Sequence, residues 1–116
     1  MSNLIIYHNP KCSKSRQTLE LITKRNLRPK IILYLEEKLS KEELQDIISK
    51  LGIKPRDLLR KGESDYKENN LGDASLKDEE LIRLMICFPK LIERPIVIKG
   101  KQAVIGRPPE NIFKLL

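Results

Sequence analysis

Apolar runs and helical repeats alternate along the N-terminal part of the chain. Residues 4–7, Leu-Ile-Ile-Tyr, are typical of a short buried strand, which ends at the turn-forming pair Asn9-Pro10. From about Ser13 the apolar positions recur at helical spacing, and a second β-rich run follows at 31–35. A strand, a helix and a strand in so few residues predict a parallel pair joined by a right-handed crossover.

The middle of the chain, residues 40–88, has the pattern of successive helices. Ser40 lies three residues before Glu43, which is capping-box spacing, and Gly52 stands where that helix would end. A second capping signal at Ser75 precedes another apolar repeat of helical period. This part of the sequence therefore predicts helices and no strand.

The strand pattern returns near the C-terminus. Residues 96–99 and 102–105 are β-rich and are separated by Gly100-Lys101, a two-residue hairpin turn. The final stretch, 108–116, is predicted to be a helix. The chain order is therefore β-α-β, a helical insertion, and β-β-α.

This order predicts a four-stranded mixed sheet with helices packed on it, the thioredoxin-like arrangement, as one α/β domain over 1–116 with the helical insertion between the second and third strands. The expected core is 1–39 with 90–116, and the expected insert is 40–89. By analogy with such folds, the Arg94-Pro95 bond before the third strand is expected to be cis and to lie beside an active cysteine.

Composition narrows the possible partners. The 116 residues carry a net charge of +7, but lysines and glutamates are interspersed, and the five aromatic residues are too few to suggest base stacking. We therefore expect no nucleic-acid partner. No apolar run reaches the roughly 20 residues that span a bilayer, and the start of the chain lacks a signal-peptide pattern, which favours a cytoplasmic protein. The two cysteines are then expected to be free thiols.

Cys12 has an unusual position for a small buried hydrophobe. It stands at the start of a predicted helix, where backbone N–H groups and the helix dipole favour an anion. Lys11, Lys14, Arg16 and the only histidine, His8, are its neighbours in sequence. These features predict that the thiolate is favoured over the thiol.

Stabilising the thiolate is not enough for catalysis. A lower thiol pKa raises the thiolate fraction but makes the thiolate a weaker nucleophile, so the net gain in rate is only about threefold. An anionic substrate would also repel it. Fixed cations that hold such a substrate would solve both problems. Three arginines near glycines or prolines are the candidates: Arg60 lies near Gly62, Arg94 precedes Pro95, and Arg107 lies between Gly106 and Pro108.

Four segments, "HNPKCSKSR", "LLRKGE", "ERPIVI" and "IGRPPE", together resemble the arsenate reductase family that works with glutathione and glutaredoxin. The resemblance covers essentially the whole chain. It implies that Cys12 is the nucleophile, that His8 and Ser15 tune its thiolate, and that Arg60, Arg94 and Arg107 bind the oxyanion. Guanidinium groups suit this role because they pair with tetrahedral oxyanions through two hydrogen bonds.

The resemblance also implies a reaction and its partners. Cys12 would attack arsenate with loss of water, glutathione would attack the adduct, and glutaredoxin would take the glutathione away as arsenite leaves. Glutathione is thus a co-substrate, glutaredoxin a partner, and no bound cofactor or metal is expected. We also expect a monomer.

Two other functions stay open. A glutathione-linked thiol oxidoreductase of the same fold would use Cys12 and His8 without needing three arginines. A redox-responsive regulator that binds RNA polymerase would carry a Cys-x-x-Cys switch, but the third residue after Cys12 is Ser15. Cys87 is expected to be structural, and His8 has the alternative role of a strand-end residue satisfied by the backbone.

Overall fold

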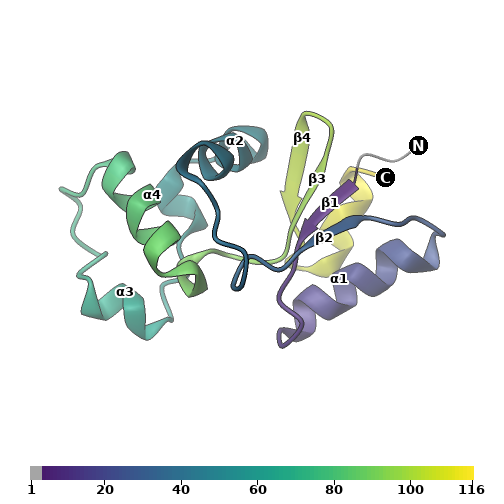
Figure 1. Ribbon diagram of the computed structural model, residues 1–116, viewed down its shortest axis with the longest axis horizontal. Helices are drawn as coiled ribbons and strands as arrows, with labels where there is room; N and C mark the ends of the chain where they lie inside the picture. Colours follow the sequence, from purple (N-terminus) through teal and green to yellow (C-terminus); the bar gives the residue numbers. More distant parts are fainter. Residues whose placement is uncertain (1–3) are drawn as a thin grey trace. The chain divides into compact units, whose positions relative to one another are not determined.

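The computed structural model describes residues 4–116, and its elements fall into two units (Figure 1). The first unit joins the N-terminal part of the chain, up to Glu37, to Arg94–Leu116. The second unit is Lys38–Glu93. The two units are described separately below.

The first unit is built on a four-stranded sheet with the order β2-β1-β3-β4. Its strands are β1 (Leu4–Tyr7), β2 (Lys30–Ile32), β3 (Ile96–Lys99) and β4 (Gln102–Ile105). β1 pairs with β2 in parallel and with β3 antiparallel, and β3 pairs antiparallel with β4 across a turn at Gly100. The predicted mixed sheet, with its parallel pair and C-terminal hairpin, is confirmed.

The second strand is shorter than the predicted run 31–35. β1 ends at Tyr7, which pairs with Ile32, so the ladder has no further strand residue to pair with. The last bond along this edge runs from the His8 backbone N–H to the Ile32 carbonyl, at 2.9 Å. The chain then turns, and the Leu33 carbonyl accepts the N–H groups of both Glu36 and Glu37.

Helix α1 (Ser13–Lys24) and the 3-10 segment η3 (Pro109–Lys114) pack on one face of this sheet (Figure 1). Their side chains Ile22 and Ile112 are fully buried against the sheet residues Leu4, Ile6 and Val97. Burial of a large aliphatic side chain stabilises a fold by about 1.5–3 kcal/mol, so this cluster supplies much of the unit's stability. The predicted C-terminal helix is present as a 3-10 helix and not as an α-helix.

The second unit contains no strand among its elements, as predicted. It comprises α2 (Lys41–Leu51), η1 (Pro55–Leu58), α3 (Ser64–Glu68), α4 (Asp78–Cys87) and η2 (Pro89–Leu91). Ser40 caps α2 by accepting the Glu43 N–H at 3.0 Å, and Gly52 ends it in the left-handed conformation at φ 69°. The predicted cap at Ser75 is wrong, because Ser75 bonds Asp73 in a turn and Lys77 precedes the helix.

Two extended segments of the second unit run side by side. Leu59 and Ile92 form an isolated antiparallel bridge. The Arg60 N–H donates to the Leu91 carbonyl at 2.8 Å, and the Glu93 N–H donates to the Leu58 carbonyl at 2.9 Å. This pairing connects "LLRKGE" directly to the start of "ERPIVI".

Both Arg-Pro bonds of the first unit, Arg94-Pro95 and Arg107-Pro108, are cis. The prediction of a cis bond before β3 is confirmed, and the second cis bond was not anticipated. None of the helices formed by residues 4–116 combines the length and the apolar character needed to cross a membrane.

Candidate active site

Cys12 is held at the N-terminus of α1 by a tight turn that begins at Asn9. The Cys12 N–H donates to the Asn9 carbonyl at 3.0 Å, and the Lys11 N–H donates to Asn9 Oδ1, also at 3.0 Å. Pro10 fits the second position of such a turn, and asparagine fits the first. Cys12 keeps an extended backbone as the N-cap of α1 and is 7% exposed. The predicted position of Cys12 at a helix start is confirmed.

His8 and Ser15 meet directly beneath this turn. His8 Nδ1 lies 2.6 Å from Ser15 Oγ, and the Asn9 N–H donates to the same oxygen at 3.0 Å. Ser15 is fully buried and His8 is 6% exposed. The contact unites two of the three predicted catalytic residues and supports the shape of the turn that carries Cys12.

Burial lowers the pKa of His8 below its ordinary value, and the positive charge of Arg16 lowers it further. At neutral pH the ring is therefore uncharged. Ser15 Oγ accepts the Asn9 N–H, and the tautomer of the His8 ring sets which of Nδ1 and Ser15 Oγ is the donor in the bond between them. A neutral His8 adds no positive charge to the Cys12 turn, and its expected role in tuning the thiolate stays a prediction. In its alternative role His8 would be a strand-end residue satisfied by the backbone. Its backbone N–H is bonded in that way, but its ring is bonded by a side chain.

Arg94 and Arg107 lie beyond the same strand ends of the sheet as the Cys12 turn. Tyr7 pairs with Ile96 and Ile96 pairs with Ile105, so β1 ends where β3 begins and β4 ends. Beyond this register, the Gly106 N–H donates to the Pro95 carbonyl at 2.8 Å. The two Arg-Pro segments are thus joined at the end of the sheet from which the chain enters the Cys12 turn. Nε and Nη1 of Arg94 are buried there.

Thr18 connects α1 to these segments and was not found from the sequence. It is fully buried, and its Oγ1 donates to the carbonyl of Lys14 at 2.8 Å and contacts the Gly106 carbonyl at 3.3 Å. A Cβ at Gly106 would lie 2.6 Å from Thr18 Oγ1 and 2.8 Å from Pro95 Cγ. Only a residue without a side chain fits between the helix and Pro95 without displacement. The one available sequence signal was a polar residue at the inward spacing of α1.

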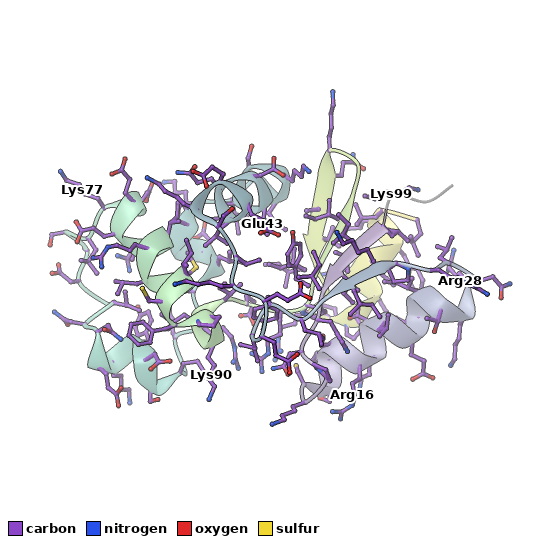
Figure 2. All side chains as sticks on the ribbon, viewed as in Figure 1. Arg16, Arg28, Glu43, Lys77, Lys90 and Lys99 are labelled. Carbon is purple, nitrogen blue, oxygen red and sulfur yellow. The ribbon has the colours of Figure 1, made fainter. Side chains whose placement is uncertain are left out.

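Arg60 belongs to the second unit, where two carboxylates contact its guanidinium. Its Nη1 donates to Glu63 Oε2 at 2.8 Å, and its Nε lies 3.6 Å from Glu93 Oε1. Among the basic neighbours of Cys12, Arg16 lies at the beginning of α1 and donates through Nη1 to the Pro10 carbonyl at 2.9 Å (Figure 2). Arg16 thus braces the turn itself.

Cys87 is an exposed free thiol at the end of α4, and Cys12 is also free. The buried face of α4 is formed by Leu81, Ile82 and Met85, and Cys87 lies off this face. Cys87 therefore does not pack in the core, and its expected structural role, in contrast to that of a resolving thiol, stays a prediction. The part of the chain that the structure describes holds no group of three or more histidine, cysteine, aspartate or glutamate side chains arranged to bind a metal.

The strand, turn and helix that present Cys12, together with the mixed sheet and the cis proline before β3, define a thioredoxin-like protein with a single cysteine at its helix start. A family model described as the ArsC family matches residues 7–115. The chain belongs to the ArsC family.

Individual relatives are similar over nearly the full length. An arsenate reductase of Haemophilus influenzae is 47% identical over 98% of this chain and 99% of its own. A protein of Escherichia coli K12 called uncharacterized protein YfgD is 47% identical over 96% of this chain and 94% of its own. The solved structure of an arsenate reductase from Vibrio cholerae has a TM-score of 0.97 at 48% identity and covers 99% of this chain and 98% of its own.

Proposed function

We propose that this protein is an arsenate reductase that reduces arsenate to arsenite, with Cys12 as its nucleophile. The single observation that carries the proposal is the position of Cys12. It caps α1 at the end of the sheet where the Arg94 and Arg107 segments also lie. A nucleophile beside fixed guanidinium groups suits a tetrahedral oxyanion. The relatives named arsenate reductase support the choice of substrate.

The first step is attack of the Cys12 sulfur on the arsenic of arsenate. An S–As bond forms, an As–O bond breaks, and the departing oxygen leaves as water after taking up protons. Arsenic is still pentavalent at this stage. His8, neutral and bonded to Ser15, keeps the turn that carries Cys12 in shape.

In the second step the glutathione sulfur attacks arsenic, a second S–As bond forms, and another oxygen leaves as water. A glutaredoxin thiol then attacks the glutathione sulfur: an S–S bond forms, the bond from that sulfur to arsenic breaks, and its electron pair stays on arsenic, which becomes trivalent. Water finally breaks the Cys12–As bond and releases arsenite and the Cys12 thiol. Over the whole cycle two thiols become one disulfide while one arsenate becomes one arsenite and one water. Glutathione is therefore consumed as a co-substrate, and no prosthetic group is needed.

The three arginines share the work of binding in this proposal. Arg60, Arg94 and Arg107 are the proposed ligands of the oxyanion. Guanidinium groups neutralise the substrate before the thiolate approaches it and hold it in line for attack. The reaction uses cytoplasmic thiol reductants, so we place the protein in the cytoplasm as a monomer that meets glutaredoxin transiently.

The direct test measures arsenate-dependent turnover in a system coupled through glutathione and glutaredoxin, with phosphate as a competing anion. Cys12→Ser is expected to abolish turnover, and Cys87→Ser is the matched control that retains it. Retained turnover in Cys12→Ser would refute the assignment of the nucleophile.

A second test separates an oxyanion substrate from another glutathione-linked thiol reaction. Arg94→Ala should remove arsenate turnover while iodoacetamide still labels Cys12. Cys12 should also be labelled faster than Cys87, although Cys87 is the more accessible thiol. If Arg94→Ala left turnover unchanged, the substrate would not be an oxyanion held by this arginine.

A further inference from the structure

The proposed oxyanion ligand Arg60 already holds carboxylate partners. Glu63 Oε2 lies 2.8 Å from Nη1, and Glu93 Oε1 lies 3.6 Å from Nε. The three side chains are each about one quarter exposed, so solvent screens the contacts only in part. Two negative charges thus compensate the one positive charge of this guanidinium.

The backbone keeps this arrangement in place. The bonds from Arg60 to Leu91 and from Glu93 to Leu58 fix residues 60 and 93 on adjacent extended segments. Glu63 lies three residues after Arg60, across a turn closed by its own N–H on the Arg60 carbonyl at 3.4 Å. One carboxylate follows Arg60 along the chain, and the other comes from the adjacent extended segment.

We infer that Glu63 is an internal competitor for the anion that binds Arg60, and that Glu93 orients the same guanidinium. A bidentate oxyanion uses two N–H groups on neighbouring nitrogens, and Glu63 occupies Nη1, one of the two terminal nitrogens. An incoming arsenate or phosphate must displace the Glu63 carboxylate, which then turns to solvent. The affinity for the oxyanion is consequently set below the value that three uncompensated arginines would give. The inference rests on the proposed binding role of Arg60.

The competition has a definite sign. If Glu63 competes, removing its charge makes anion binding tighter. If Glu63 only held Arg60 in position, removing the charge would make anion binding weaker. A partly exposed ion pair is worth little, so the expected change is about two- to fivefold.

The test uses Glu63→Gln, which keeps the size of the side chain and removes its charge. We expect the KM for arsenate and the inhibition constant of inorganic phosphate both to fall about two- to fivefold, while kcat changes less than KM. Asp46→Asn is the matched control, because Asp46 pairs with Lys50 at 3.0 Å in the same unit and its loss changes the net charge equally. A thermal melt of both variants checks that they fold.

Glu93→Gln and Arg60→Ala complete the experiment. Glu93→Gln is expected to raise the KM for arsenate slightly. Glu93 contacts Nε at a longer distance than Glu63 contacts Nη1, and in this proposal it orients the guanidinium and does not compete with the anion. In an Arg60→Ala background, Glu63→Gln should have no effect on KM.

The outcomes distinguish the role of Arg60 from the role of Glu63. If Arg60→Ala leaves the KM for arsenate unchanged, the proposed role of Arg60 fails. If Arg60→Ala raises the KM but Glu63→Gln raises it too, or behaves like Asp46→Asn, the competition is refuted while the oxyanion role of Arg60 stands.

Discussion

Ser15→Ala tests whether the buried hydroxyl beneath the Cys12 turn supports the site. Ser15 Oγ accepts the Asn9 N–H and bonds His8 Nδ1, so the substitution leaves two polar groups without this partner. A buried polar group that loses its partner costs about 1–3 kcal/mol, and the partly buried Asn9 N–H belongs at the low end of that range. The sum is about 2–4 kcal/mol.

One gain offsets part of this cost. Alanine is the better helix former, and Ser15 lies inside α1, which returns about 0.5 kcal/mol. The free energy of unfolding should therefore fall by about 1.5–3.5 kcal/mol, which lowers Tm by several degrees in a chain of this size. Urea unfolding monitored by circular dichroism measures the difference directly.

Two comparisons make the experiment decisive. Ser13 is exposed in the same helix, so Ser13→Ala should change stability by less than about 0.5 kcal/mol. In a His8→Leu background Ser15→Ala should cost less than in the wild type, because only the Asn9 N–H then loses a partner. If Ser15→Ala and Ser13→Ala had equal stability, the hydrogen bonds at Ser15 would not hold the turn.

Three further predictions follow from single contacts. Gly106→Ala should lower the free energy of unfolding in urea by about 1–3 kcal/mol, because its Cβ would meet Thr18 Oγ1 at 2.6 Å. Gly72→Ala is the control and should be nearly neutral, since the nearest neighbour of its Cβ would be at 3.8 Å. Equal effects of the two substitutions would contradict the tight fit at Gly106. Because the pKa of His8 is lowered in the folded protein, the unfolded chain binds the His8 proton more tightly. The free energy of unfolding should therefore fall as the pH drops below 6.5, the ordinary pKa of histidine, and His8→Gln should remove this part of the pH dependence. If His8→Gln left the slope of stability against pH unchanged, other groups would cause it. Arg56→Ala should speed amide hydrogen exchange around 71–75, because Arg56 holds the carbonyls of Leu71 and Asp73 at 2.8 and 2.9 Å, and unchanged exchange there would show that these bonds are dispensable.

The strands of the hairpin and the start of β1 could be predicted from the sequence because their signals are local. Alternating or continuous apolar residues and a Gly-Lys turn determine 96–105 without reference to the rest of the chain. The cap at Ser40 and the end at Gly52 are similarly local. The predicted cap at Ser75 is absent because the backbone N–H and the hydroxyl of Ser75 both bond the carboxylate of Asp73. The spacing of residues in the sequence does not show whether a serine bonds a helix N-terminus or a nearby carboxylate.

The candidate site divides in the same way. The place of Cys12 at a helix start follows from a strand, an Asn-Pro turn and a helical repeat that are contiguous in sequence. The end of β2 depends on where β1 stops, and the fit of Gly106 depends on Thr18, a residue 88 positions away. Contacts of this kind have no signature in either partner alone.

The sequence by itself therefore determined the order of elements, the fold class and the position of the thiol, since each depends on neighbours a few residues apart. Only the tertiary structure decided that His8 is buried and neutral against Ser15, that Cys87 is exposed, and that Arg60 is held by Glu63 and Glu93. Charge state and competition between ion pairs depend on burial and on distances in space, and these arise only when separate segments pack together.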